Sequence, residues 1–248
     1  MTIKQIIVGA MLSTLIFVPQ SMSAQKLFTL EDLNFGGNNF HNMVPKNRYA
    51  TWWGDQLVRT DAEFCALVDK KTGKETRLFS TDELNKWIYP NGENKVRSLY
   101  SATFPYPNQT LVLLNVNKTR MLVNWKTKKV DWKQEAKDEI AADWNAQSRA
   151  VAFVKDDNLY VNDGKGVLKQ LSTDGSRNIV YGQSVHRDEF GIYKGTFWSN
   201  DGQKLAFYRM DQSMVADYPL VDVDTRIATE TPIHYPMAGE KSHLVTVG

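Results

Sequence analysis

A serine beside a histidine, with glycine close by, is the combination most suggestive of nucleophilic hydrolysis in this 248-residue chain. It occurs in Gly182-Gln183-Ser184-Val185-His186. A serine elbow also requires a second glycine two residues after the serine and a helix behind it, and the sequence indicates neither. Ser184 is therefore interpreted as an imitation of a nucleophile and His186 as a structural residue. We predict no catalytic residue in this chain.

Metal and thiol chemistry are also not indicated. The four histidines lack the spacing of a zinc site, and no glycine loop of the phosphate-binding type is present, so we expect no metal and no cofactor. The single cysteine, Cys65, excludes an internal disulfide. Because it lies within an apolar, strand-like run, we interpret it as a buried, inert thiol rather than a nucleophile.

One short segment, Arg187-Asp188-Glu189, places two acids side by side and is followed by aromatic residues at Phe190 and Tyr193. From the residue types alone, Glu189 is interpreted as a solvated acid in a charged turn, and Arg187 as a local neutralising partner of Asp188. Whether Glu189 also binds a ligand depends on the secondary-structure elements that position this segment.

Those elements are predicted to be β-strands. Short β-branched and aromatic runs recur between turn residues, and no stretch keeps helical periodicity beyond a few turns. The clearest strands are Leu57–Thr60, Phe64–Asp69, Thr110–Val116, Met121–Trp125, Ala150–Lys155, Leu159–Asn162 and Leu205–Met210. Two short helices are expected after Thr29 and Ser80, where each hydroxyl residue is followed three positions later by an acid. The fold class is all-β.

A weak internal repeat refines this prediction. The segment from Trp144 to Val154 resembles the one from Trp198 to Tyr208, and in both a tryptophan leads through a polar turn into an apolar strand that carries Ala-Phe. Four-stranded units of roughly 40 to 50 residues are typical of β-propeller blades. We therefore predict a partial β-propeller of about four blades, truncated before its ring closes. A β-sandwich with coincidental spacing is the alternative.

The N-terminus has the pattern of an export signal. Lys4 precedes an apolar run that is too short for a comfortable membrane span, and small residues end at Ala24. Residues 1–24 are thus a predicted signal peptide and residues 25–50 a leader, while the propeller occupies residues 51–248. The product is expected in the periplasm, at the cell surface or secreted. With 30 basic and 28 acidic residues, the chain offers no electrostatic case for binding nucleic acid.

The segment from Val180 to Ser199 resembles the dipeptidyl peptidase IV family of prolyl oligopeptidase-type serine peptidases, most closely the bacterial prolyl tripeptidyl peptidases. The similarity continues through Leu205–Val215, His234–Gly239 and His243–Gly248 and is diffuse from Phe28 onward. It implies a propeller joined to an α/β-hydrolase domain, near which the leader would pack. That domain and its catalytic triad are missing from these residues, so this portion alone should be inactive. A homodimer is also implied.

The resemblance assigns a role to Glu189: it would bind the free amino terminus of a peptide substrate that is cleaved after proline. Dipeptidyl peptidases of the family present two adjacent glutamates, whereas this chain has Asp188-Glu189. Strand neighbours tend to point to opposite sides, so we favour one working acid and leave dipeptide or tripeptide release open. Arg187, Asp188, Phe190 and Tyr193 are secondary candidates. The rival hypothesis is a non-catalytic secreted propeller that binds a peptide or glycan.

Overall fold

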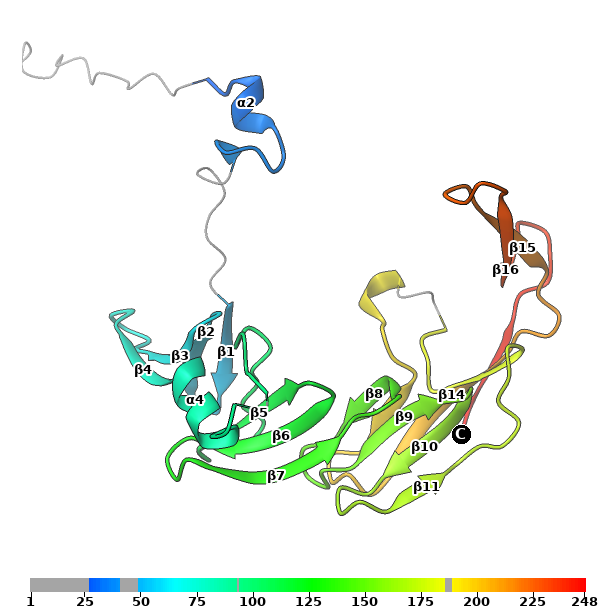
Figure 1. Cartoon of the computed structure of the whole chain (residues 1–248). Coiled ribbons are helices and arrows are strands. Elements are labelled where there is room, and N and C mark those ends of the chain that lie inside the picture. The colour runs from blue at the N-terminus through cyan, green and yellow to red at the C-terminus, as the bar shows by residue number, and fades with distance from the viewer. Residues whose placement is uncertain (1–26, 41–48, 93, 186–188) are drawn as a thin grey trace, which may run out of the picture. The chain divides into compact units, whose positions relative to one another are not determined.

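The computed structural model describes residues 27–40, 49–92, 94–185 and 189–248 (Figure 1). Two compact units are present, Met1–Asn47 and Arg48–Gly248. The predicted signal peptide lies outside the described residues. In the first unit, helix α2 (Leu30–Leu33) is capped by Thr29, whose Oγ1 accepts from the Asp32 N–H at 3.1 Å while the Asp32 carboxylate accepts from the Thr29 N–H at 2.9 Å. The capping box predicted at Thr29 is confirmed.

The second unit begins with a four-stranded antiparallel sheet in the order β1-β2-β3-β4. Its strands are β1 (Tyr49–Trp53), β2 (Gln56–Thr60), β3 (Phe64–Val68) and β4 (Glu75–Ser80). Helix α4 (Thr81–Ile88) follows directly and begins at the capping box predicted from Ser80 and Glu83, in which the Ser80 N–H donates to Glu83 Oε2 at 2.9 Å. Both helices predicted from the sequence are thus confirmed.

Two further sheets follow in chain order. The second sheet has the order β5-β6-β7, and an isolated bridge between Thr103 and Leu113 adds a rudimentary fourth strand. The third has the order β11-β10-β9-β8. Their strands are β5 (Leu111–Val116), β6 (Thr119–Asn124), β7 (Lys129–Glu135), β8 (Ile140–Trp144), β9 (Val151–Lys155), β10 (Asn158–Asn162) and β11 (Leu168–Gln170).

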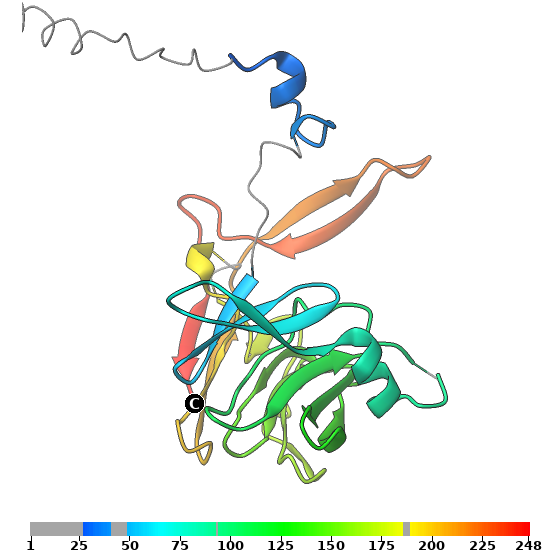
Figure 2. The same ribbon diagram turned by 90° about the vertical axis from the view of Figure 1, so that its left-hand side faces the viewer.

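The fourth sheet is built around β14 (Leu205–Asp211), which pairs with three strands. These are β12 (Ile179–Tyr181), β13 (Thr196–Trp198) and β17 (Leu244–Val247). The hairpin of β15 (Asp217–Asp222) and β16 (Thr229–His234) pairs only with itself among the described strands and extends away from the four sheets (Figures 1 and 2). The repeat seen in the sequence corresponds to the hairpins β8–β9 and β13–β14.

Successive sheets share hydrophobic cores. The largest core joins the first sheet and α4 to the second sheet and contains Phe79 and Trp125. A second core packs Leu111, Leu113 and Leu122 against Trp144 of the third sheet, and a third core packs Leu159 against Tyr181 and neighbours in the fourth. A middle sheet therefore buries one face against the sheet before it and the other against the sheet after it. This is how propeller blades are stabilised, and it confirms the predicted all-β, propeller-type architecture.

Cys65 is fully buried in β3, as predicted. Desolvation, reinforced by the nearby charge of Asp61, raises the pKa of its thiol to about 12. Because the thiolate is the reactive form, we expect negligible reaction with a disulfide reagent such as Ellman's reagent at pH 8 in the folded protein, and one equivalent after unfolding in guanidinium chloride. Rapid labelling of the native protein would show that Cys65 is accessible and would contradict this.

Candidate functional site

The segment that carries Glu189 is a loop inserted between two short strands, β12 and β13, that pair with the same edge of β14. The N–H of Gly182, just after β12, donates to the Tyr208 carbonyl at 2.9 Å, and the Tyr208 N–H donates to the Gly195 carbonyl, just before β13, at 2.8 Å. The main-chain N–H and carbonyl of Tyr208 both point to one edge of β14, whereas those of Phe207 bond to Gly248 on the other edge. Strands β12 and β13 therefore lie end to end along the same edge. Residues 183–194, which we call the inserted loop, leave and rejoin it opposite Tyr208.

Two glycines close the base of the inserted loop. The Gly195 N–H donates to the Gly182 carbonyl at 3.3 Å. A Cβ on Gly195 would lie 2.7 Å from the main-chain nitrogen and carbonyl carbon of Gln183, and closer still to its carbonyl oxygen. Gly182 has a φ of 60°, a conformation that favours glycine. The chain leaves the sheet at Gly182 and re-enters it at Gly195, and both glycines lie opposite Tyr208. This close approach is possible because neither residue has a side chain.

The inserted loop contains the sites predicted from the sequence. Glu189 begins a short helical turn, η1 (Glu189–Gly191), drawn in yellow in Figure 1. The structure describes the main chain of Glu189 but not its side chain, and Arg187 and Asp188 lie outside the described residues. Phe190 has a φ of 56° and is 89% exposed, and Tyr193 is 71% exposed. These two aromatic rings are therefore open to solvent on either side of Gly191 rather than packed in a blade core.

Ser184, the imitation nucleophile, has a structural role within the inserted loop. Its hydroxyl donates to the Ile192 carbonyl at 2.9 Å and so joins the outgoing and returning halves of the loop. Phe197 of β13 is 39% exposed, and its ring packs edge-on against Tyr208 of β14 at 5.3 Å between centroids.

Tyr181 anchors the outgoing side of the loop base. Its hydroxyl donates to Asp174 Oδ1 at 2.6 Å and accepts from Arg209 Nε at 3.1 Å. The hydrogen bond from Tyr181, together with Arg209, holds the pKa of the Asp174 carboxyl below its usual range. This ionised carboxylate therefore stabilises the residue that immediately precedes Gly182.

The returning side of the loop base contacts the third sheet. Lys194, Thr196 and Trp198 all donate hydrogen bonds to Asp143 of β8. The sequence pattern drew no attention to Asp143 or Lys194, because they lie 51 positions apart. The only sequence feature that hinted at this contact was the alternation of three hydrogen-bond donors in Lys194-Gly195-Thr196-Phe197-Trp198.

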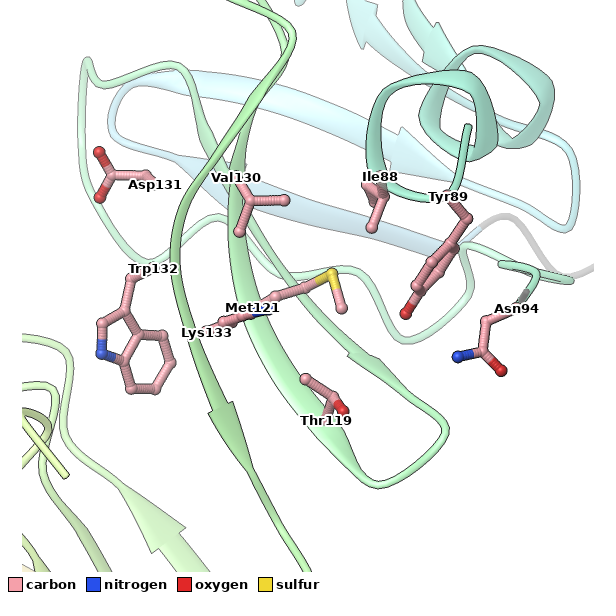
Figure 3. Close-up of a pocket in the computed structure, with 9 residues that line it drawn as sticks. All are labelled: Ile88, Tyr89, Asn94, Thr119, Met121, Val130, Asp131, Trp132 and Lys133. Carbon is pink, nitrogen blue, oxygen red and sulfur yellow. The ribbon is translucent and has the colours of Figure 1, made fainter. Parts of the chain in front are cut away.

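Hollows occur at several places in the second unit. One of about 480 Å³ lies between the end of α4 and strands β6 and β7. Figure 3 shows Tyr89, Met121 and Val130 directed into it, with Trp132 turned away. A smaller hollow of about 130 Å³ adjoins the inserted loop at Ser184. Neither brings together a serine, a histidine and an acid in the manner of a hydrolase, and no cluster suited to a metal occurs among the described residues.

Within the described part of the chain, no helix has the length and apolar character needed to cross a membrane.

Comparisons with known proteins agree with this architecture. The family model described as "Dipeptidyl peptidase IV (DPP IV) N-terminal region" matches residues 80–248. Two curated fungal relatives, both named probable dipeptidyl-aminopeptidase B, come from Talaromyces stipitatus and Talaromyces marneffei. They are 29% and 31% identical to this chain over 179 residues, and each match covers 59% of this chain and 20% of the relative.

Solved structures show the same relationship. A candidate dipeptidyl aminopeptidase IV from Bacteroides ovatus superposes with a TM-score of 0.72 and 38% identity, covering 90% of this chain and 31% of that one. Porphyromonas gingivalis dipeptidyl peptidase 4, at 20% identity and a TM-score of 0.58, shares the fold. This chain spans 20% of the two curated relatives and about a third of the solved proteins. It belongs to the dipeptidyl peptidase IV family, whose N-terminal propeller region it forms.

Proposed function

We propose that this chain is the substrate-selecting propeller portion of an exported prolyl serine exopeptidase, in which Glu189 binds the free amino terminus of the peptide. The observation that carries the proposal is the inserted loop: it lifts Glu189 out of the strand line on a base held to β14. The exposed rings of Phe190 and Tyr193 lie within four residues of Glu189 and could flank a bound peptide.

The chemistry suits a single carboxylate. An α-amino group with a pKa near 8 is mostly cationic at neutral pH, and a carboxylate accepts charge-assisted hydrogen bonds from it. Such a bond contributes about 1.5 to 3 kcal/mol, which favours a peptide end over an internal peptide by roughly tenfold to more than a hundredfold. Selection for a free amino terminus, which defines an exopeptidase of this kind, can therefore depend on one well-placed acid.

The proposal covers release of either dipeptides or tripeptides. The single glutamate in Asp188-Glu189 favours tripeptides, since the family's dipeptidyl members present two. Peptide cleavage would be performed by an α/β-hydrolase domain of the same protein. Export and a homodimer belong to the same proposal; the apolar run after Lys4 supports the first and the family resemblance the second.

The proposal is tested by replacing Glu189 with glutamine in the full-length protein. We expect kcat/KM for chromogenic Xaa-Pro and Xaa-Xaa-Pro substrates to fall by roughly tenfold to a hundredfold, because the amide is neutral and loses the charge-assisted bond. Comparing the two substrate lengths also decides between dipeptide and tripeptide release.

Glu240→Gln is the matched control, since Glu240 is an exposed glutamate in a turn near the C-terminal end of the chain. It should leave kcat/KM unchanged. If Glu189→Gln behaves like this control, Glu189 does not bind the amino terminus and the assignment is wrong.

A further inference from the structure

Asp143 is the acceptor at which the returning end of the inserted loop joins the preceding sheet. Its carboxylate accepts two hydrogen bonds from Lys194 Nζ, at 3.0 and 2.9 Å, and one from Thr196 Oγ1 at 3.1 Å. Its main-chain carbonyl accepts a further hydrogen bond from Trp198 Nε1 at 3.0 Å. Its side chain is only 15% exposed, so these bonds lie mostly out of solvent.

The three donors form a ladder on one face of the chain. Thr196 and Trp198 lie in β13 and Lys194 lies two residues before it, and alternate residues of an extended chain point to the same side. Thr196 is completely buried, whereas Lys194 remains half exposed. The ladder therefore runs from the sheet interior to the surface, where the inserted loop ends at Lys194.

Asp143 itself occupies an irregular stretch of β8. The pairing of β8 with β9 shifts register between Ile140 and Asp143, and Ala141 has a φ of 50°. Bulges of this kind redirect a side chain from its regular orientation in the ladder. The irregularity thus accompanies a carboxylate that reaches across to the next sheet.

From this arrangement we infer that Asp143 is a positioning residue for the amino-terminus site, because it fixes the returning end of the loop that carries Glu189. The inference rests on the proposed function of Glu189. Lys194 lies only five residues after Glu189. The hydrogen bond from Ser184 to the Ile192 carbonyl also ties this returning half of the loop to the outgoing half. Without the Asp143 contacts, a smaller fraction of the molecules would hold Glu189 in its binding position. The apparent affinity for the peptide would fall in proportion to that fraction.

The experiment uses two variants of the full-length protein. Asp143→Asn keeps an acceptor for Thr196 but removes the charge that Lys194 binds, and Asp143→Leu removes every side-chain acceptor. We expect KM for Xaa-Xaa-Pro substrates to rise by about threefold in the first and about tenfold in the second, with kcat little changed. Lys194→Gln should resemble Asp143→Asn, while Lys194→Arg should retain most of the affinity.

Hydrogen–deuterium exchange of peptides covering residues 183–194, measured without substrate, provides a second readout. Exchange should accelerate about tenfold in Asp143→Leu, and less in Asp143→Asn, because the loop opens more often. The matched control is Asp131→Asn, which removes an ion pair of equal length, 2.9 Å, between β7 and Arg149. It should alter neither KM nor exchange in the loop.

The outcomes separate the two proposals. If Glu189→Gln raises KM but the Asp143 variants change neither KM nor exchange, Asp143 only joins two sheets and the inference is overturned. If exchange rises in the Asp143 variants while Glu189→Gln has no effect on KM, the positioning of the loop stands and the role of Glu189 fails. A rise in KM accompanied by equal acceleration of exchange throughout the protein would reflect general unfolding and would also overturn the inference.

Discussion

Replacing Gly195 with alanine should destabilise the protein by about 3 kcal/mol or more and abolish the selection for a free amino terminus that we propose for Glu189. The added Cβ would overlap main-chain atoms of Gln183, which cannot rotate away as the end of a side chain can. The two strands of the loop base must separate, which breaks the bonds of Gly195 to Gly182 and Tyr208. Each such bond contributes about 1 kcal/mol, and the displaced backbone adds strain.

The measurement is urea unfolding combined with kcat/KM on Xaa-Pro and Xaa-Xaa-Pro substrates. Gly191→Asn is the control for stability, because Gly191 lies in the same loop with a φ of 72° and nothing within 4 Å of an added Cβ. Asparagine tolerates this conformation, so the control should cost about 1 kcal/mol or less. A Gly195→Ala protein as stable as the control would mean that the two ends of the inserted loop do not meet as described.

Replacing Phe79 with alanine should cost about 3 to 5 kcal/mol in the free energy of unfolding. The Phe79 ring is completely buried, and its centroid lies 5.5 Å from Trp125 and 6.4 Å from Phe104. Trp125 also packs edge-on against Trp53 at 5.3 Å. Removal of Phe79 therefore leaves a cavity lined by large rings that join the first and second sheets and cannot collapse readily.

Urea unfolding followed by tryptophan fluorescence measures this effect, since Trp53 and Trp125 report on the same core. Tyr100→Ala is the matched control: its ring also pairs with an aromatic, Tyr49 at 5.0 Å, but is 52% exposed. Its loss should cost about 1 kcal/mol or less. Equal costs for the two variants would show that the first two sheets do not share a packed core at Phe79.

Elements specified by near neighbours were predictable from the sequence. Seven strands were placed to within one or two residues of their observed ends, because alternation and β-branching are local signals. The capping boxes at Thr29 and Ser80 are also local, since donor and acceptor lie three residues apart. The hairpin β15–β16 was missed because Pro219 and Pro232, which face each other, resemble strand breakers; a two-stranded ribbon tolerates them since both strands are edges.

The amino-acid sequence by itself determined the all-β class, the blade-like repeat, the buried thiol and the family resemblance that singles out Glu189. Only the tertiary structure decided that β12 and β13 share one edge of β14, that two glycines close the loop between them, and that Asp143 holds the returning end. The physical reason is separation along the chain: Asp143 and Lys194 are 51 residues apart, and no local pattern specifies which edge of a distant strand a segment will join. Packing of successive sheets makes that choice.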